Sequence, residues 1–152
     1  MKHIIKSLEK AYRLYKQPHK IGDLIEFQQK QWIIIGIEAV SIDLNKLRVI
    51  YTVQNAEEVY AYQPPISDIG KTVEIIARVR TGKEAILEKI QVGRLVWIDN
   101  KPYQSVGFID IDIEFTDVVI TLLGRPVRPI PIKEVRAKVL NERKKKLNLQ
   151  VL

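Results

Sequence analysis

Three acidic side chains at alternate positions are the residues of this chain best suited to binding a metal ion. Asp110, Asp112 and Glu114 alternate with isoleucine, and alternate residues of a strand lie on one face. Carboxylates on one face could hold a hard cation such as Mg²⁺, which prefers oxygen ligands. The same alternation is what the solvated face of a half-buried strand requires, and we favour that second interpretation.

The other candidates for catalysis or cofactor binding lack the context that their chemistry needs. Gly70-Lys71-Thr72 resembles the end of a phosphate-binding loop, but the glycine required five residues earlier is replaced by Pro65. The two histidines, His3 and His19, have no carboxylate at ligand spacing, and the chain has no cysteine. The four serines lie in no nucleophile elbow: Ser7, Ser41, Ser67 and Ser105. We therefore expect no enzyme, no cofactor and no metal site.

An internal repeat predicts how the chain is organised. Shifted by 71 positions, residues 21–51 align without a gap on residues 92–122. Five pairs are identical: Gly22/Gly93, Leu24/Leu95, Lys30/Lys101, Gly36/Gly107 and Ile42/Ile113. Strand composition alone would align Val, Ile and aromatic residues, but it does not predict matching glycines and a matching turn lysine. We interpret the pattern as two modules of one type.

Alternation of apolar and polar residues predicts four short strands in each module. We expect them at 24–27, 32–37, 40–44 and 47–53 in the first module, and at 95–98, 103–109, 111–115 and 118–123 in the second. A meander this small cannot cover both of its faces. The expected fold is therefore mainly β with terminal α-helices, as two small SH3-like antiparallel β-barrels or, alternatively, one shared β-sandwich or barrel.

The expected domains follow from these segments. Helical spacing of six apolar residues predicts an amphipathic basic helix over residues 1–20: Ile4, Ile5, Leu8, Ala11, Tyr12 and Tyr15. The β modules are expected at 21–62 and 92–124, with a connector and a leading strand at 63–91. Residues 125–152 read as a proline-rich extended segment and a second basic helix, from about Ile132 to Lys146.

The net charge of +7 is concentrated at the two ends of the chain. Residues 1–20 carry six basic residues against one acidic, and residues 125–152 carry nine against two. Residues 21–76 carry four against eight, and residues 77–124 six against seven. Basic ends and neutral to acidic modules are complementary, which favours association between copies.

Composition bounds the class of protein. A chain of 152 residues with 46% hydrophobic and 28% charged residues is typical of a folded protein. The absence of cysteine fits a reducing compartment. No apolar run approaches the ~20 residues of a membrane span, and charges at Lys2, Lys6, Glu9 and Lys10 interrupt any signal-peptide core. We expect synthesis in the cytoplasm and no secretion by a signal peptide.

Recognition residues are expected where the two modules differ and where basic residues cluster. Trp97 stands where the first module has Glu26, an outward position by alternation, so it is a candidate contact residue. The expected partner-binding set consists of aromatic and basic residues: Trp97, Arg94, Tyr60, Tyr62, Arg125, Arg128, Arg143, Lys144, Lys145 and Lys146.

Two hypotheses follow for function. The Gly–strand–turn–strand units at Gly22–Ile37 and Gly93–Ile109 resemble small SH3-like barrels of the head-to-tail connector and other structural components of tailed phage particles. The resemblance is architectural and assigns no residue a role; it implies a non-enzymatic protein that oligomerises or docks on other structural proteins, and so becomes part of a virion. The alternative is a nucleic-acid-binding module that uses its basic terminal helices. Neither hypothesis involves a membrane or a small-molecule substrate.

Overall fold

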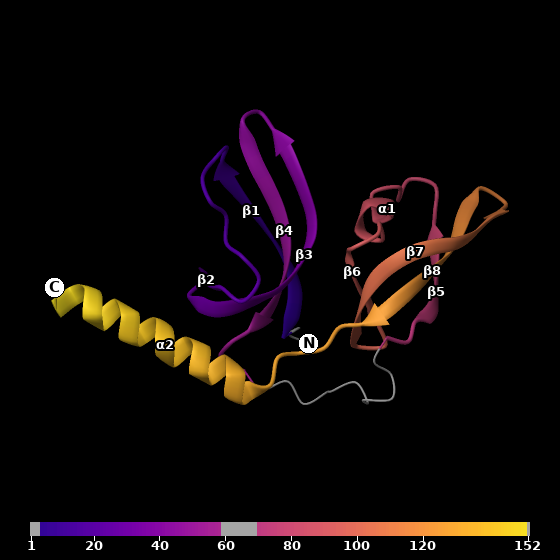
Figure 1. The fold of residues 1–152 in the computed structure, drawn as a ribbon. Helices are drawn as coiled ribbons and strands as arrows, with labels where there is room; N and C mark the ends of the chain where they lie inside the picture. The colour runs from indigo at the N-terminus through magenta and orange to yellow at the C-terminus, as the bar shows by residue number, and fades with distance from the viewer. Residues whose placement is uncertain (1–3, 59–69, 152) are drawn as a thin grey trace. The chain divides into compact units, whose positions relative to one another are not determined.

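The computed structural model describes residues 4–58 and 70–151, with side chains as far as residue 147. The chain divides into two compact units, one drawn from Met1–Gln63 together with Pro129–Leu152 and the other from Pro64–Arg128. Each unit contains one four-stranded antiparallel sheet (Figure 1), as expected for a mainly β protein. Among the described residues, no helix has both the length and the apolar composition needed to cross a membrane.

The first sheet consists of β1 (Ile5–Arg13), β2 (Leu24–Phe27), β3 (Lys30–Asp43) and β4 (Lys46–Asn55). Its strand order is β1-β4-β3-β2, with β1 and β2 at the two edges. One face carries a core of seven buried residues: Leu8, Ile25, Trp32, Ile34, Val49, Tyr51 and Val53.

The second sheet consists of β5 (Val73–Val79), β6 (Leu95–Ile98), β7 (Lys101–Glu114) and β8 (Asp117–Pro126), in the order β5-β8-β7-β6. A four-residue helix, α1 (Ile86–Lys89), lies in the connection between β5 and β6. The core consists of five buried residues on one face: Ile75, Val79, Ile90, Ile120 and Leu122.

The two sheets correspond strand by strand. β6, β7 and β8 begin and end 71 residues after β2, β3 and β4. The backbone amide of Gly22 donates to the Ile34 carbonyl at 2.8 Å, and that of Gly93 to the Ser105 carbonyl at 2.8 Å. Both glycines have positive φ, 97° and 94°, which glycine adopts without a steric penalty. The sheets share strand order, turn positions and irregularities, while their origin in a duplication stays a prediction.

The expected N-terminal helix is wrong, because residues 5–13 form strand β1. β1 pairs with β4 along its whole length, from Ile5 opposite Gln54 to Arg13 opposite Lys46. Leu8 and Tyr12 are four residues apart, a spacing that satisfies both the helical period and strand alternation. Both pack against the core of the first sheet, so tertiary contact decides between the two readings.

In each module, the second and third expected strands form one long strand, β3 in the first sheet and β7 in the second. β3 and β7 run through the points at which alternation suggested a break, and each has two register shifts, near Gly36 and Glu38 in β3 and near Gly107 and Ile109 in β7. A β-bulge inserts one residue and reverses the alternation beyond it. No pairing joins the two edge strands of either sheet among the described residues, so neither sheet closes into a barrel.

The C-terminal helix α2 (Ile132–Val151) packs on the first sheet, on the face opposite its core. Val135 is fully buried in a cluster with Ile33 and Ala56. The amide of Gln54 holds the segment that leads into α2, because it donates to the Ile130 carbonyl at 3.0 Å and accepts from the Ile130 amide at 2.7 Å. Beyond this anchor the helix runs past the sheet (Figure 1).

Gln54→Ala should lower the free energy of unfolding by about 2 kcal/mol, because it leaves two backbone groups of Ile130 without their partner. The measurement is urea denaturation followed by circular dichroism. Gln17→Ala is the matched control, since the Gln17 amide contacts only the exposed Pro18 carbonyl. Equal effects of the two substitutions would contradict the anchoring role.

Candidate functional site

Two rows of exposed apolar side chains lie on the core faces of the sheets, towards the free ends of the long hairpins. Paired residues of an antiparallel ladder share a face, so Val40 opposite Val49 and Ile111 opposite Ile120 belong to the core faces. We name them row 1 (Ile37, Val40, Ile42) and row 2 (Phe108, Ile111, Ile113). Val40 and Ile42 are 61% and 66% exposed, and Ile111 and Ile113 are 62% and 67% exposed.

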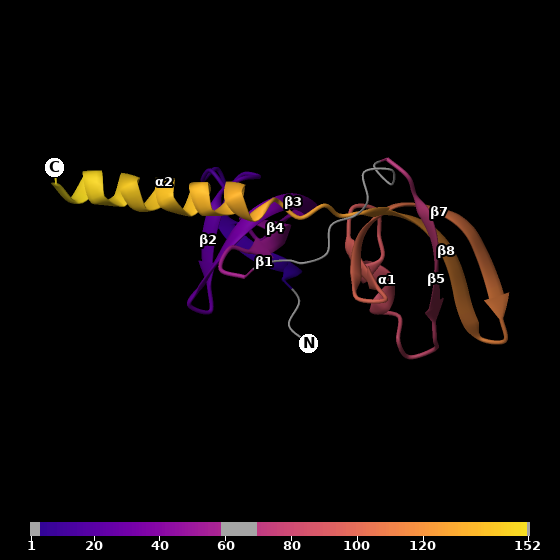
Figure 2. The same ribbon diagram turned by 90° about the horizontal axis from the view of Figure 1, so that it is seen from below.

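The rows are exposed because the covering strand is short. β2 pairs with β3 only over Lys30–Ile33, and β6 pairs with β7 only over Lys101–Gln104. Figure 1 shows the β3–β4 and β7–β8 hairpins extending well beyond β2 and β6, and Figure 2 shows the β7–β8 hairpin from a second direction. Beyond these short pairings, the outer edges of β3 and β7 have no partner strand among the described residues. Exposed apolar surface beside an unpaired edge is typical of a protein-interaction site.

Among the described residues, the acids of β7 are not grouped as metal ligands. Asp110, Asp112 and Glu114 are exposed, and Arg78 of β5 makes ion pairs with both Glu114 and Asp117, the latter at 3.0 Å. These two carboxylates hold the pKa of the Arg78 guanidinium above its ordinary value. Within the described residues, no group of three acidic or histidine side chains could hold a metal ion. The acidic face instead gives the second hairpin a negative surface.

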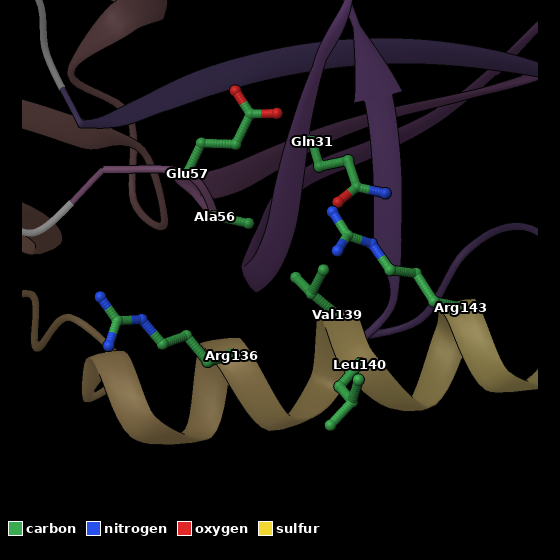
Figure 3. Close-up of a pocket in the computed structure, with 7 residues that line it drawn as sticks. All are labelled: Gln31, Ala56, Glu57, Arg136, Val139, Leu140 and Arg143. Carbon is green, nitrogen blue, oxygen red and sulfur yellow. The ribbon is translucent and has the colours of Figure 1, made fainter.

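A groove of about 380 Å³ lies between α2 and the first sheet (Figure 3). Apolar side chains line its middle, with Ala56 from the sheet side and Val139 and Leu140 from the helix. Arg136 and Arg143 stand at its opposite ends, seven residues apart on α2, which is about two helical turns or 10 Å. Sequence reasoning did not find this groove.

The groove is positively charged on its helix side. Gln31 and Glu57 complete its lining from the sheet side, so one carboxylate faces two guanidinium groups. The described part of α2, residues 132–147, carries seven basic residues and two acidic ones. Lys144, Lys145 and Lys146 follow the groove on the exposed end of the helix. The groove therefore suits a ligand that places an apolar group between the helix and the sheet and a negatively charged group next to the arginines.

The expected partner-binding residues are divided among different parts of the chain. Trp97 of β6 is half-buried and lies opposite Pro102 of β7, so its side chain is less exposed than alternation indicates. Arg94 donates to the Glu88 carbonyl in α1 at 3.1 Å. Six basic residues of the set are exposed: Arg125, Arg128, Arg143, Lys144, Lys145 and Lys146. Lys145 makes a surface ion pair with Glu142, with the charged atoms 3.9 Å apart, while Tyr60 and Tyr62 lie outside the described residues.

Lys6 closes the base of the first core. Its Nζ lies 4.3 Å from the ring centre of Trp32 and 4.5 Å from that of Phe27, a cation–π arrangement. Burial lowers the pKa of the Lys6 ammonium, while its aliphatic stem can cover apolar surface. The Trp32 indole N–H has no hydrogen-bond acceptor in the described structure. This cluster shields the core rather than presenting a reactive group.

His19, Ser7 and Ser105 make contacts that support the fold, whereas Ser41 is exposed. His19 Nδ1 lies 2.9 Å from the Tyr12 hydroxyl, and the His19 carbonyl accepts from Tyr51 at 2.7 Å. Ser7 donates to the buried Glu38 carboxylate at 2.7 Å. Ser105 donates to the Ile90 carbonyl at 3.0 Å. The described hydrogen bonds of Ser7 and Ser105 are thus to Glu38 and Ile90, and those of His19 are to Tyr12 and Tyr51.

Magnesium at millimolar concentration should leave the melting temperature of the protein unchanged, because Arg78 already neutralises part of the acidic face. The measurement is differential scanning fluorimetry with and without MgCl₂. Arg78→Gln is the comparison variant, in which the carboxylates lose their cation. A clear rise in the melting temperature of the unsubstituted protein would show that the acidic strand binds the ion.

Comparisons with protein-family models, with curated proteins and with solved structures found no match for this chain. The surfaces available for recognition are set by its own geometry: two apolar rows, an acidic hairpin and a groove beside a basic helix.

Proposed function

We propose that this chain is a non-enzymatic assembly protein, which joins copies of itself or docks on a larger complex. The observation that carries the proposal is the pair of apolar rows, at corresponding positions of the two hairpins and on the same faces as the cores. Exposed apolar residues scattered singly are ordinary, but contiguous rows mark interaction surfaces. The unpaired edges of β3 and β7 add backbone groups that a partner strand could pair with.

The size of the rows favours assembly through several contacts. Burying a half-exposed Ile or Val contributes about 1 kcal/mol, so one row of three residues supplies only a few kcal/mol. Association costs roughly 4–15 kcal/mol in lost translational and rotational freedom. One row alone therefore falls short, whereas two rows on one chain allow repeated contacts whose strengths combine.

The proposal includes a finer architectural reading. Each sheet, with its short edge strand and long bulged hairpin, is proposed to be an open form of a small SH3-like module, and the pair to derive from a duplication. On this reading the protein is a structural component of the kind found in tailed phage particles, such as a head-to-tail connector or tail protein. The correspondence of strand bounds at 71 residues supports the reading.

A second candidate function is binding of nucleic acid through α2. The exposed run Arg143, Lys144, Lys145 and Lys146 favours it, since basic side chains attract phosphates through a largely sequence-independent charge effect. Nucleic-acid binding is weakened as a candidate because the expected basic helix at the N-terminus is strand β1, whose basic residues belong to a sheet. Assembly remains the proposal that the described surface supports better.

Ile111→Ser combined with Ile113→Ser should weaken self-association at least tenfold, because it removes most of row 2. The pair Val40→Ser and Ile42→Ser tests row 1 in the same way. Molar mass is measured by size-exclusion chromatography with light scattering over a range of protein concentrations.

Ile76→Ser is the matched control for these variants. Ile76 is 72% exposed but lies opposite Thr121, off the core face of the second sheet. Its substitution should leave the molar mass unchanged. An unsubstituted protein that stays monomeric, yet shifts strongly with DNA at about 150 mM salt, would favour nucleic-acid binding over assembly.

A further inference from the structure

We infer that the tip of the β7–β8 hairpin of one copy docks in the groove beside α2 of a second copy, with Phe115 as its anchor. The inference rests on the proposed self-assembly and names the two surfaces that meet. One surface belongs to each unit, so every copy carries one tip and one groove. The two surfaces differ, and such head-to-tail contacts build rings or filaments instead of closed pairs.

Phe115 is the most exposed large apolar side chain of the described structure, at 101% of its reference area. It stands in the two-residue loop between Glu114 and Asp117 with φ of 56°. The same backbone geometry occurs at the first residue of the other two-residue turns, since Gln28, Leu44 and Asp99 also have positive φ. No described residue of its own unit covers the ring.

The loop that presents Phe115 is held from β5 and the segment that follows it. Arg78 makes ion pairs with Glu114 and Asp117, and the Thr81 hydroxyl donates to the Thr116 carbonyl at 3.2 Å. A loop whose neighbouring residues are held in this way loses little backbone freedom when it binds, so less free energy is spent on ordering the interface. The tip is preorganised as an aromatic anchor.

The groove has room and lining for such an anchor. Its volume is about 380 Å³, whereas an apolar cavity of about 150 Å³ can hold benzene. Figure 3 shows Ala56 and Val139 on facing sides of it, with Arg143 reaching up towards Gln31. A ring inserted between the helix and the sheet would contact these apolar groups and leave the acidic loop residues at the ends of the groove.

Charge decides which hairpin tip fits. Residues 110–117 contain four acidic residues and no basic one, and the arginines at the ends of the groove are complementary to them. The corresponding residues of the first hairpin, 39–46, contain one acidic and one basic residue. Leu44 is the apolar residue at the tip of this hairpin. Leu44 has a similar exposure, 87%, and φ of 48°. It is therefore a control matched in geometry but not in charge or aromatic character.

The test uses full-length variants of the tip and of the groove. Phe115→Ser, and Arg136→Glu combined with Arg143→Glu, should each reduce the apparent association constant at least tenfold, because aromatic and arginine anchors dominate interfaces. Leu44→Ser should associate like the unsubstituted protein. Circular dichroism melting curves show whether each variant folds, which is expected because the substituted side chains are exposed.

Mixing the two deficient variants gives the sharpest outcome. The tip variant keeps an intact groove and the groove variant keeps an intact tip, so an equimolar mixture should regain association through the one intact tip and the one intact groove of each mixed pair. Light scattering after size-exclusion chromatography measures its mass. A mixture that stays monomeric, or a Phe115→Ser protein that associates like the unsubstituted chain, overturns the inference.

The result also separates this inference from the proposed function. If substitution of row 2 weakens association while Phe115→Ser does not, assembly stands and this docking mode fails. If the unsubstituted protein is monomeric at every concentration, self-docking of the tip is excluded, whatever other partners the rows contact.

Discussion

The mismatch in length between paired strands governs the surface of both sheets. β2 and β6 have four residues each, whereas β3 and β7 have fourteen each. The short strand can cover only the base of the long hairpin, and the core forms there. Beyond it, the same apolar alternation continues without anything to cover it, so rows 1 and 2 are uncovered extensions of the cores. Two bulges in each long strand bend the hairpin and re-aim its side chains.

Much of the sheet structure could be predicted because its signals are local. Alternation identified most strand positions, and the turn residues Gln28-Gln29 and Asp99-Asn100 lie where two-residue loops with positive φ join the strands. The identity of β1 could not be decided locally, because Leu8 and Tyr12 fit either period and only pairing with β4 distinguishes them.

The candidate surfaces were harder to predict, for two physical reasons. The residues of row 2 alternate with acids as a half-buried strand does, so sequence indicates the correct face without showing that the covering strand stops early. The groove depends on contacts remote in sequence, because Gln54 and Ile130 are 76 residues apart. Trp97 is a candidate because Glu26 stands at the corresponding position, but the exposure of its side chain is set by neighbours that alternation does not include.

The anchoring of Ile130 by Gln54 makes the second unit an insertion within the first. The chain leaves the first unit near Gln63 and returns at Pro129. During synthesis the first sheet emerges first, and the whole inserted unit follows it. Only then comes α2, the helix that packs on the first sheet opposite its core. Closing so long a loop costs conformational entropy, but an inserted unit that has already folded leaves less free chain to close. The order of translation therefore places the covering of Ile33 by Val135 after both sheets have been made, and the groove beside α2 forms only once residues 132–143 have followed them.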